Sequence, residues 1–233
     1  MRTVVAISIV AAATLLMGVQ AAGLARTGRV RTQGTPFAKA VIFLEFNYTD
    51  EDVGVHIQTD HGIGLREETV ISPDGRIVAG LSWRTRPPLG LTELNTESAE
   101  PDAERALRAY PEGTYRFNGW TIHGDRLFST AVLSHELLPA PEITYPADGA
   151  DDVPTTLVTA TWNAMPGAVG YIVEFEADVA GGVKLETRLP ASSPSFSIPE
   201  GMLEPGTPYK IGVAGIHANG NLSLAAIGFE TAP

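Results

Sequence analysis

The stretch Leu203-Glu204-Pro205-Gly206-Thr207-Pro208-Tyr209 leads directly into a β-rich run that ends at Ala214, and it decides how the second half of the chain folds. Tyr209 can bury its ring while its hydroxyl hydrogen-bonds to backbone just upstream, at the turn that the proline and glycine create. Further short apolar runs recur between Ala160 and Phe229, with turn residues between them and no helical period. This pattern predicts a β-sandwich over residues 141–233.

Three landmarks in this half resemble those of a fibronectin type III domain. They are Trp162, Tyr171 nine residues later, and the Leu-x-Pro-Gly-Thr-x-Tyr stretch that ends at Tyr209. In that family the tryptophan packs between the two sheets and the tyrosine forms a corner before a strand. Asn219–Ser223 is similar to the loop before the last strand of the family. The resemblance implies the fold of residues 141–233 and no particular activity, because one fold serves many functions.

The residues from 39 to 138 predict a second β-rich domain, for which we recognise no family. Ala40–Phe46 is nearly continuous in apolar residues and suits a central strand, whereas Val53–Gln58 alternates and suits a half-buried one. Ser72–Gly75 and His123–Arg126 are turn signals between β-rich runs and predict two hairpins. Asp102–Ala109 has the composition of a short helix. The predicted fold class is therefore all-β, with two immunoglobulin-like β-sandwich domains in tandem and one short helix in the first.

The start of the chain predicts export. Residues 1–25 combine a basic Arg2, an apolar middle and a small-residue end, which is the pattern of a secretory signal peptide. An uncleaved membrane anchor is the alternative, because the uncharged run could just span a bilayer. Residues 26–38 read as a flexible lead-in, and Pro139–Pro141 reads as a short, stiff linker. We expect a protein outside the cytoplasm: periplasmic, at the cell surface or secreted.

Composition removes several classes of function. The chain has no cysteine, which excludes disulfides, thiol catalysis and thiolate zinc sites. Its net charge is −11, and residues 141–233 contribute 3 basic and 11 acidic residues, or −8. An acidic chain without a basic stripe is repelled by phosphate backbones, so we expect no nucleic-acid partner. Two N-x-[ST] sequons begin at Asn47 and Asn221, and we do not expect them to be glycosylated.

No catalytic residue, cofactor site or metal site is predicted. There is no Gly-x-Ser-x-Gly elbow, and the serines fall on turns or expected strands. His56 and His61 are five residues apart and point to opposite faces of an extended strand, so we interpret them as surface histidines. A pocket that gathered His56, His61 or His123 with carboxylates would instead indicate an unrecognised enzyme.

Two groups of residues have a second interpretation as ligand sites. Asp50-Glu51-Asp52 could bind calcium through loop carboxylates, although its spacing does not match an EF-hand and a solvated acidic turn is the simpler interpretation. Trp83 and Trp120, with Arg84 and Arg86 beside the first, could stack on sugar rings. Tryptophan in an alternating strand is more often part of the core.

These observations favour a non-catalytic exported protein that acts in protein–protein interaction or envelope structure, with an envelope or extracellular protein as its partner. The first alternative is a carbohydrate-binding or adhesion protein that uses exposed aromatics of the first domain to bind polysaccharide. The second alternative is an envelope enzyme of unrecognised type.

Overall fold

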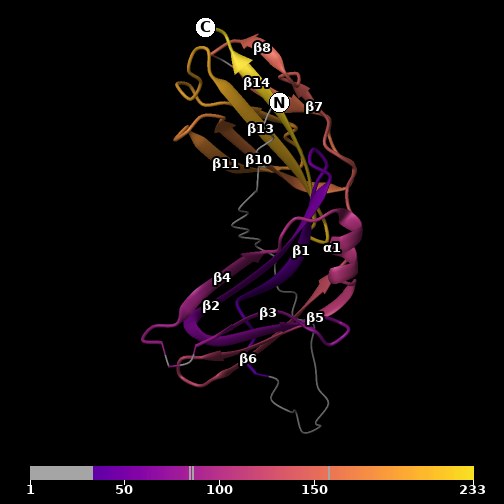
Figure 1. The fold of residues 1–233 in the computed structure, drawn as a ribbon, viewed down its shortest axis with the longest axis vertical. Helices are drawn as coiled ribbons and strands as arrows, with labels where there is room; N and C mark the ends of the chain where they lie inside the picture. The colour runs from indigo at the N-terminus through magenta and orange to yellow at the C-terminus, as the bar shows by residue number, and fades with distance from the viewer. Residues whose placement is uncertain (1–33, 84, 86, 157) are drawn as a thin grey trace.

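The computed structural model describes residues 34–233 except 84, 86 and 157, and in this part of the chain the predicted fold class is confirmed. The described residues form strands and a single helix, and they divide into an N-terminal and a C-terminal unit (Figure 1). The predicted signal peptide and most of the predicted lead-in lie outside the described residues. No helix within residues 34–233, the three gaps aside, is long and apolar enough to cross a membrane.

The N-terminal unit is organised around one long, bent strand. Its elements are β1 (Lys39–Asn47), β2 (Asp52–Ile71), β3 (Ile77–Ser82), β4 (Leu91–Glu97), α1 (Ala103–Ala109), β5 (Gly113–Thr121) and β6 (Arg126–Leu133). The first half of β2 pairs with β1 on one edge and β4 on the other, and its second half pairs with β3 and β5. The sheet therefore folds over at the bend of β2 and encloses a core that includes Leu44, Val55, Tyr115 and Phe117.

The sequence predicted both hairpins and the helix of this unit. The β2–β3 hairpin turns at Ser72–Gly75, and β5–β6 turns at residues 122–125. Asp102 caps α1 by accepting a hydrogen bond from the Arg105 amide. The expectation of a half-buried strand at Val53–Gln58 was wrong: every residue from 53 to 59 is buried. The folded-over sheet covers one face of this strand, and side chains of β1 and β4 crowd the other.

The C-terminal unit is a sandwich of two sheets. Strands β12 (Ser195–Ser197), β9 (Thr159–Trp162) and β7 (Ile143–Tyr145) form one sheet; β11 (Lys184–Pro190), β10 (Ala168–Ala177), β13 (Pro208–His217) and β14 (Leu222–Thr231) form the other, with β8 (Ala150–Val153) beside β14. Trp162 is buried edge-on against Tyr171, with ring centroids 5.4 Å apart. The Tyr209 hydroxyl accepts from the Glu204 amide (2.7 Å) and donates to the Met202 carbonyl (3.2 Å). Both sequence expectations for these landmarks are confirmed.

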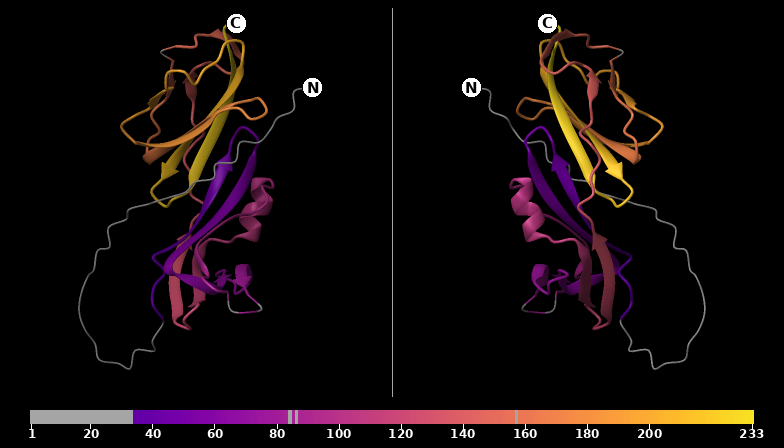
Figure 2. Two further views of the ribbon diagram at one scale, coloured as in Figure 1. Left: turned by 90° about the vertical axis from the view of Figure 1, so that its left-hand side faces the viewer. Right: turned by 90° about the vertical axis from the view of Figure 1, so that its right-hand side faces the viewer.

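The two units share one sheet. Residues 45–47 of β1 pair in parallel with residues 222–224 of β14, which makes a continuous sheet from β11 to β6 (Figure 2). From the sequence, only the prolines of the linker at residues 139–141 indicated a stiff joint between the units. The structure offers a stronger cause, because hydrogen bonds across a strand pair restrain orientation more than a short linker does.

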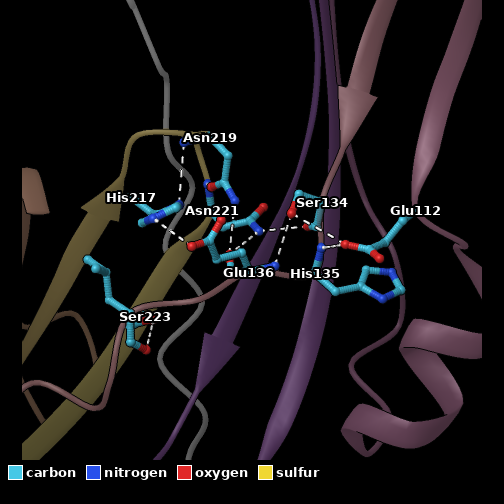
Figure 3. Close-up of polar contacts among 9 residues, drawn as sticks. Glu112, Ser134, His135, Glu136, His217, Asn219, Asn221 and Ser223 are labelled. Carbon is cyan, nitrogen blue, oxygen red and sulfur yellow. Dashed lines mark hydrogen bonds and ion pairs between the residues drawn. The ribbon is translucent and has the colours of Figure 1, made fainter. Parts of the chain in front are cut away.

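Asn221 fills the joint between the units (Figure 3). Its Oδ1 accepts from the Leu44 amide at 2.9 Å, and its Nδ2 donates to the carbonyls of Ser134 and Glu136 at 2.8 Å. The side chain of Asn221, just before β14, therefore links the C-terminal unit to β1 and to the residues that follow β6. Asn221 and Asn47 are 1% and 4% exposed, so neither sequon is accessible in the folded protein.

A candidate interaction surface at the tip of the first unit

Six large apolar side chains are exposed in the N-terminal unit, and four of them lie on neighbouring segments: Ile63, Trp83, Leu89 and Trp120 are 52%, 44%, 82% and 39% exposed, whereas Ile77 and Val132 lie elsewhere. We refer to these four as the tip. They belong to the bend of β2, the segment after β3, and the end of β5, which lie at the lower left of Figure 1, away from the C-terminal unit. Scattered single apolar residues are ordinary on a protein surface, but a group of them marks a binding surface.

Backbone contacts hold the segments of the tip together. The Ile122 amide donates to the Gly64 carbonyl at 3.1 Å, which joins the β5–β6 turn to the bend of β2. Gly64 has a φ of +77°, and its Cα carries no side chain where the Leu89 carbonyl approaches. Ser82 and Trp120 both pair with Glu67, one on each edge of β2. Ser82, the residue before Trp83, and Trp120 therefore lie on the two strands that flank β2.

The tryptophans correct one sequence interpretation. Trp83 and Trp120 are exposed, so their assignment to the core was wrong. On β5 the side chains of Tyr115 and Phe117 face the core, and Trp120 lies an odd number of residues from both, so its side chain is on the opposite face of the strand. Arg84 and Arg86, suggested as polar neighbours of Trp83, lie outside the described residues.

The histidines are not gathered in one place. His56 and His61 are 4% and 6% exposed, which contradicts their interpretation as surface residues. As expected for an odd separation on a strand, they occupy opposite faces: His56 stacks on Phe43, and His61 lies edge-on to Phe37. His123 is exposed in the β5–β6 turn. The arrangement that would have indicated an enzyme is not formed by these three residues.

His56 lies instead between two carboxylates. Its Nε2 is 3.4 Å from Glu45 Oε2 and 3.5 Å from Glu97 Oε1. Burial raises the pKa of Glu97 to about 7, although the nearby His56 opposes this. No group of three or more His, Asp or Glu side chains has the geometry to hold a metal ion within the described ranges.

The acidic turn at Asp50–Asp52 is less solvated than the sequence suggested. Burial raises the pKa of Asp52 to about 6, and the neighbouring Glu100, Asp50 and Glu45 carboxylates add to the effect. Asn47 holds the turn, because its Oδ1 accepts from the amides of Thr49 and Asp50. Nothing in this geometry supports calcium binding over the simpler structural role.

Glu68 is a buried carboxyl in the core of the first unit. It is 1% exposed, and its Oε2 accepts from Thr59 Oγ1 at 2.8 Å while Oε1 has no hydrogen-bond partner in the described chain. Burial raises its pKa from 4.5 to about 7, which the Thr59 hydrogen bond only partly opposes. Between about pH 4.5 and 7, the Glu68 carboxyl is therefore protonated in the folded state and ionised in the unfolded state.

This proton gives a stability prediction. Because the folded pKa lies above the unfolded one, the contribution of Glu68 to stability is fully present below pH 4.5 and is lost as pH rises through about 7, by up to roughly 3 kcal/mol. Glu68→Gln should remove this loss, so the variant should be more stable than wild type at about pH 8 and similar near pH 4.5. Urea unfolding across pH measures it. Glu67→Gln, a neighbour with a 44% exposed side chain, is the matched control and should leave the profile unchanged.

Comparisons with known proteins leave the activity open. No family model and no curated protein matches the chain. Among solved structures it is similar to FN1–FN3 domains of chicken CNTN1 (13% identity, 86% of this chain and 69% of that one, TM-score 0.32). It is also similar to the fibronectin(III)-like modules of Clostridium thermocellum CbhA (11%, 84% and 93%, TM-score 0.35) and to a segment of two fibronectin type III domains of chicken tenascin (13%, 76% and 92%, TM-score 0.33).

These likenesses are weak, and the fold of the C-terminal unit rests on its own features. A three-stranded sheet faces a four-stranded one in the order β12-β9-β7 and β11-β10-β13-β14. Trp162 packs between the sheets, and the Tyr209 hydroxyl closes its corner on backbone upstream. By these features the C-terminal unit has the fold of a fibronectin type III domain.

Proposed function

We propose that this is a non-catalytic exported protein that binds another envelope or extracellular protein through the tip of its N-terminal unit. The observation that carries the proposal is the exposure of Ile63, Trp83, Leu89 and Trp120 at one end of that unit. Exposed aromatic and aliphatic side chains lose water-accessible area when a partner covers them, and tryptophan is the residue most often responsible for binding energy at such surfaces.

The joint between the units supports this role. A tip on a loosely tethered domain would lose orientation, whereas the β1–β14 pairing and Asn221 hold the tip at a set angle to the C-terminal unit. The C-terminal unit then acts as a spacer that presents the tip. We therefore infer a presenting and binding function rather than catalysis.

Sugar binding is the second candidate, because both tryptophans are exposed. The tip also contains Ile63 and Leu89, which are the two most exposed of the four. Aliphatic side chains contribute area to a protein interface but offer no flat ring to stack on a sugar. The composition of the tip therefore favours a protein partner.

The test uses photo-cross-linking at residue 120 of the exported protein in its native cells. A cross-linker at Val169, 56% exposed in the C-terminal unit, is the control position. We expect one protein to be captured at residue 120 only. When purified, it should bind wild type and bind Trp120→Ala at least about tenfold more weakly, as for an anchor residue at an interface.

Two outcomes would contradict the protein-binding proposal. One is equal capture at residues 120 and 169. The other is a polysaccharide that quenches tryptophan emission in wild type but not in Trp120→Ala. That readout is specific because Trp162, the third tryptophan, is 3% exposed and Trp83 and Trp120 dominate any response to an added ligand.

A further inference from the structure

A group of titratable side chains surrounds His56, on the face of the first unit's sheet that points away from its core. His56 Nε2 lies within 3.5 Å of a carboxylate oxygen of both Glu45 and Glu97 but hydrogen-bonds to neither, and both Glu45 oxygens also lack a hydrogen-bond partner in the described chain. We refer to His56, Glu45, Glu97, Asp52 and Glu100 as the acidic cluster. Buried polar groups without hydrogen bonds cost free energy, so the cluster does not serve stability alone.

Three strands place the cluster, and a glycine makes room for it. Glu45 is on β1, His56 is on β2, and Glu97 lies directly opposite His56 on β4. Gly54 pairs with Glu45, and a Cβ added to Gly54 would lie 3.0 Å from Glu97 Oε1 and 3.5 Å from His56 Nε2. The carboxylates and the imidazole therefore meet above a residue without a side chain, and a larger residue there would crowd them.

No lysine or arginine balances the cluster. Within residues 34–233, the three gaps aside, neither Glu45 nor Glu97 forms an ion pair with either kind of residue. Asp102, which bridges to Asp52, is occupied in capping α1. Cations on the same face of the sheet lie beside other carboxylates: Lys39 is near Glu93 and Asp60, and Lys184 pairs with Glu174 and Glu176. His56 is therefore the one member of the cluster that can carry positive charge.

The face that carries the cluster is concave and continues into the C-terminal unit. In a flat sheet β11 would lie about 19 Å from β1, four strand spacings away. However, a cavity of about 320 Å³ is lined by residues of β1 and by Arg188 of β11. In Figure 1, β11 and β4 lie on the same side of the molecule, at the left. The sheet is therefore curved, and β11 lies across the hollow from β1.

A further carboxylate, Glu186 on β11, faces the cluster across this hollow. Burial raises the pKa of Glu186, the nearby Arg188 and Lys184 lower it, and the Glu45 carboxylate raises it. A charge in contact with solvent acts on a pKa mainly within about 10 Å, so Glu45 and Glu186 are close enough to repel each other. Glu186 is thus the group through which the C-terminal unit senses the charge of the cluster.

The cluster exchanges protons near neutral pH. Burial raises the pKa of Glu97 from 4.5 to about 7, with His56 opposing and Glu45 and Glu100 adding to the effect. Burial, with Glu100, Asp50 and Glu45, raises the pKa of Asp52 from 3.8 to about 6. Because both folded values lie above the ordinary ones, the cluster binds protons that exposed carboxyls would release. Its contribution to stability is lost as pH rises through about 6 and then about 7.

We propose that the acidic cluster is a pH-dependent switch at the joint, which closes the concave face when protonated and opens it when ionised. With protons bound, β11 approaches β1. After the protons leave, the charges of Glu97, Glu45 and Asp52 repel Glu186 across the hollow, and the C-terminal unit tilts away. The pairing of β1 with β14 holds the units together in both states and acts as the hinge. The joint therefore sets a different angle in each state.

The test measures the distance between the units with two spin labels. The chain has no cysteine, so labels attach only to introduced ones. Ile77→Cys and Val179→Cys are suitable, because both side chains are exposed, one in each unit, and Val179 lies in the turn before β11. We expect a narrow distance distribution at about pH 5, and a shift to longer distances with broadening at about pH 8.5. Circular dichroism shows whether the protein is folded at both values.

Glu97→Gln is the decisive variant. It keeps the size of the side chain but cannot ionise, so it should give nearly the pH 5 distribution at about pH 8.5 as well. Glu45→Gln should also remove most of the shift, because Glu45 acts on Asp52 and Glu97 as well as on β11. Glu93→Gln, exposed on the same strand and face, is the matched control and should leave the shift unchanged. Glu68→Gln should also leave it unchanged, which separates the switch from the stability effect of that carboxyl.

The proposal is overturned if folded wild type gives the same distance distribution at both pH values. It is also overturned if Glu97→Gln and Glu45→Gln both keep the full shift, or if Glu93→Gln removes the shift as completely as Glu97→Gln. If one of the two cluster variants does not fold, the other decides.

Discussion

Alanine in place of Gly64 is expected to lower the free energy of unfolding by roughly 3 kcal/mol, the cost of a strained backbone and a steric overlap together. Gly64 adopts a φ of +77°, a region that favours glycine, and a Cβ built there would overlap the Leu89 carbonyl oxygen. The overlap is with backbone, so no rotamer change can relieve it. Relief would require the segment after β3 to move away from the bend of β2.

Gly62→Ala is the matched control. Gly62 is two residues away on the same bend, its φ lies outside the left-handed region, and an added Cβ would meet nothing within 4 Å. It should change stability by no more than about 0.5 kcal/mol. Urea unfolding followed by tryptophan emission compares the two variants. Equal effects would show that the bend tolerates a side chain at either place and that the Leu89 carbonyl does not pack closely against Gly64.

Asn221→Ala is expected to cost roughly 3 kcal/mol, because it removes three hydrogen bonds at the joint and leaves the Leu44 amide without its partner, whereas the Glu136 carbonyl still accepts from Asn219 Nδ2. The Leu44 amide and the carbonyls of Ser134 and Glu136 each lose a hydrogen bond to the Asn221 side chain. Water cannot easily replace a side chain that is 1% exposed. Asn221→Asp should be nearly as costly, since it keeps the acceptor for Leu44 but loses both donors and introduces a charge.

The same unfolding experiment measures this effect, with Asn95→Ala as control. Asn95 is exposed, and its side chain donates only to Glu93, so its loss should be nearly neutral. Amide exchange at Leu44 provides a local readout, which should quicken in Asn221→Ala. If Leu44 stays protected and stability is unchanged, the pairing of β1 with β14 alone holds the units together.

The sequence predicted features that depend on neighbouring residues. Turn residues at Ser72–Gly75, the capping Asp102 and the corner at Tyr209 each act within a few positions of themselves, and the structure confirms them. The same holds for the buried Trp162, whose place follows from a local pattern shared with a known fold.

Features that depend on distant residues were missed. Val53–Gln58 was assigned one solvated face, because nothing in its alternation shows that side chains of β1 and β4 cover that face. The tryptophans were assigned to the core by residue type, although the parity of Tyr115 and Phe117 on the same strand places Trp120 on the outside. Asn221 attracted notice only as part of a sequon. Its role depends on Leu44, which lies 177 residues away in the sequence.

That separation also sets an order of events during synthesis. An edge of β1 meets its partner only after β14 has been made, and contacts between residues so far apart in sequence form slowly. Until then β1 presents an apolar strand with an open edge, which is the kind of element that pairs wrongly with other chains. A chain that is kept unfolded until both units have been made would avoid this hazard, whereas early folding of the N-terminal unit alone would prolong it.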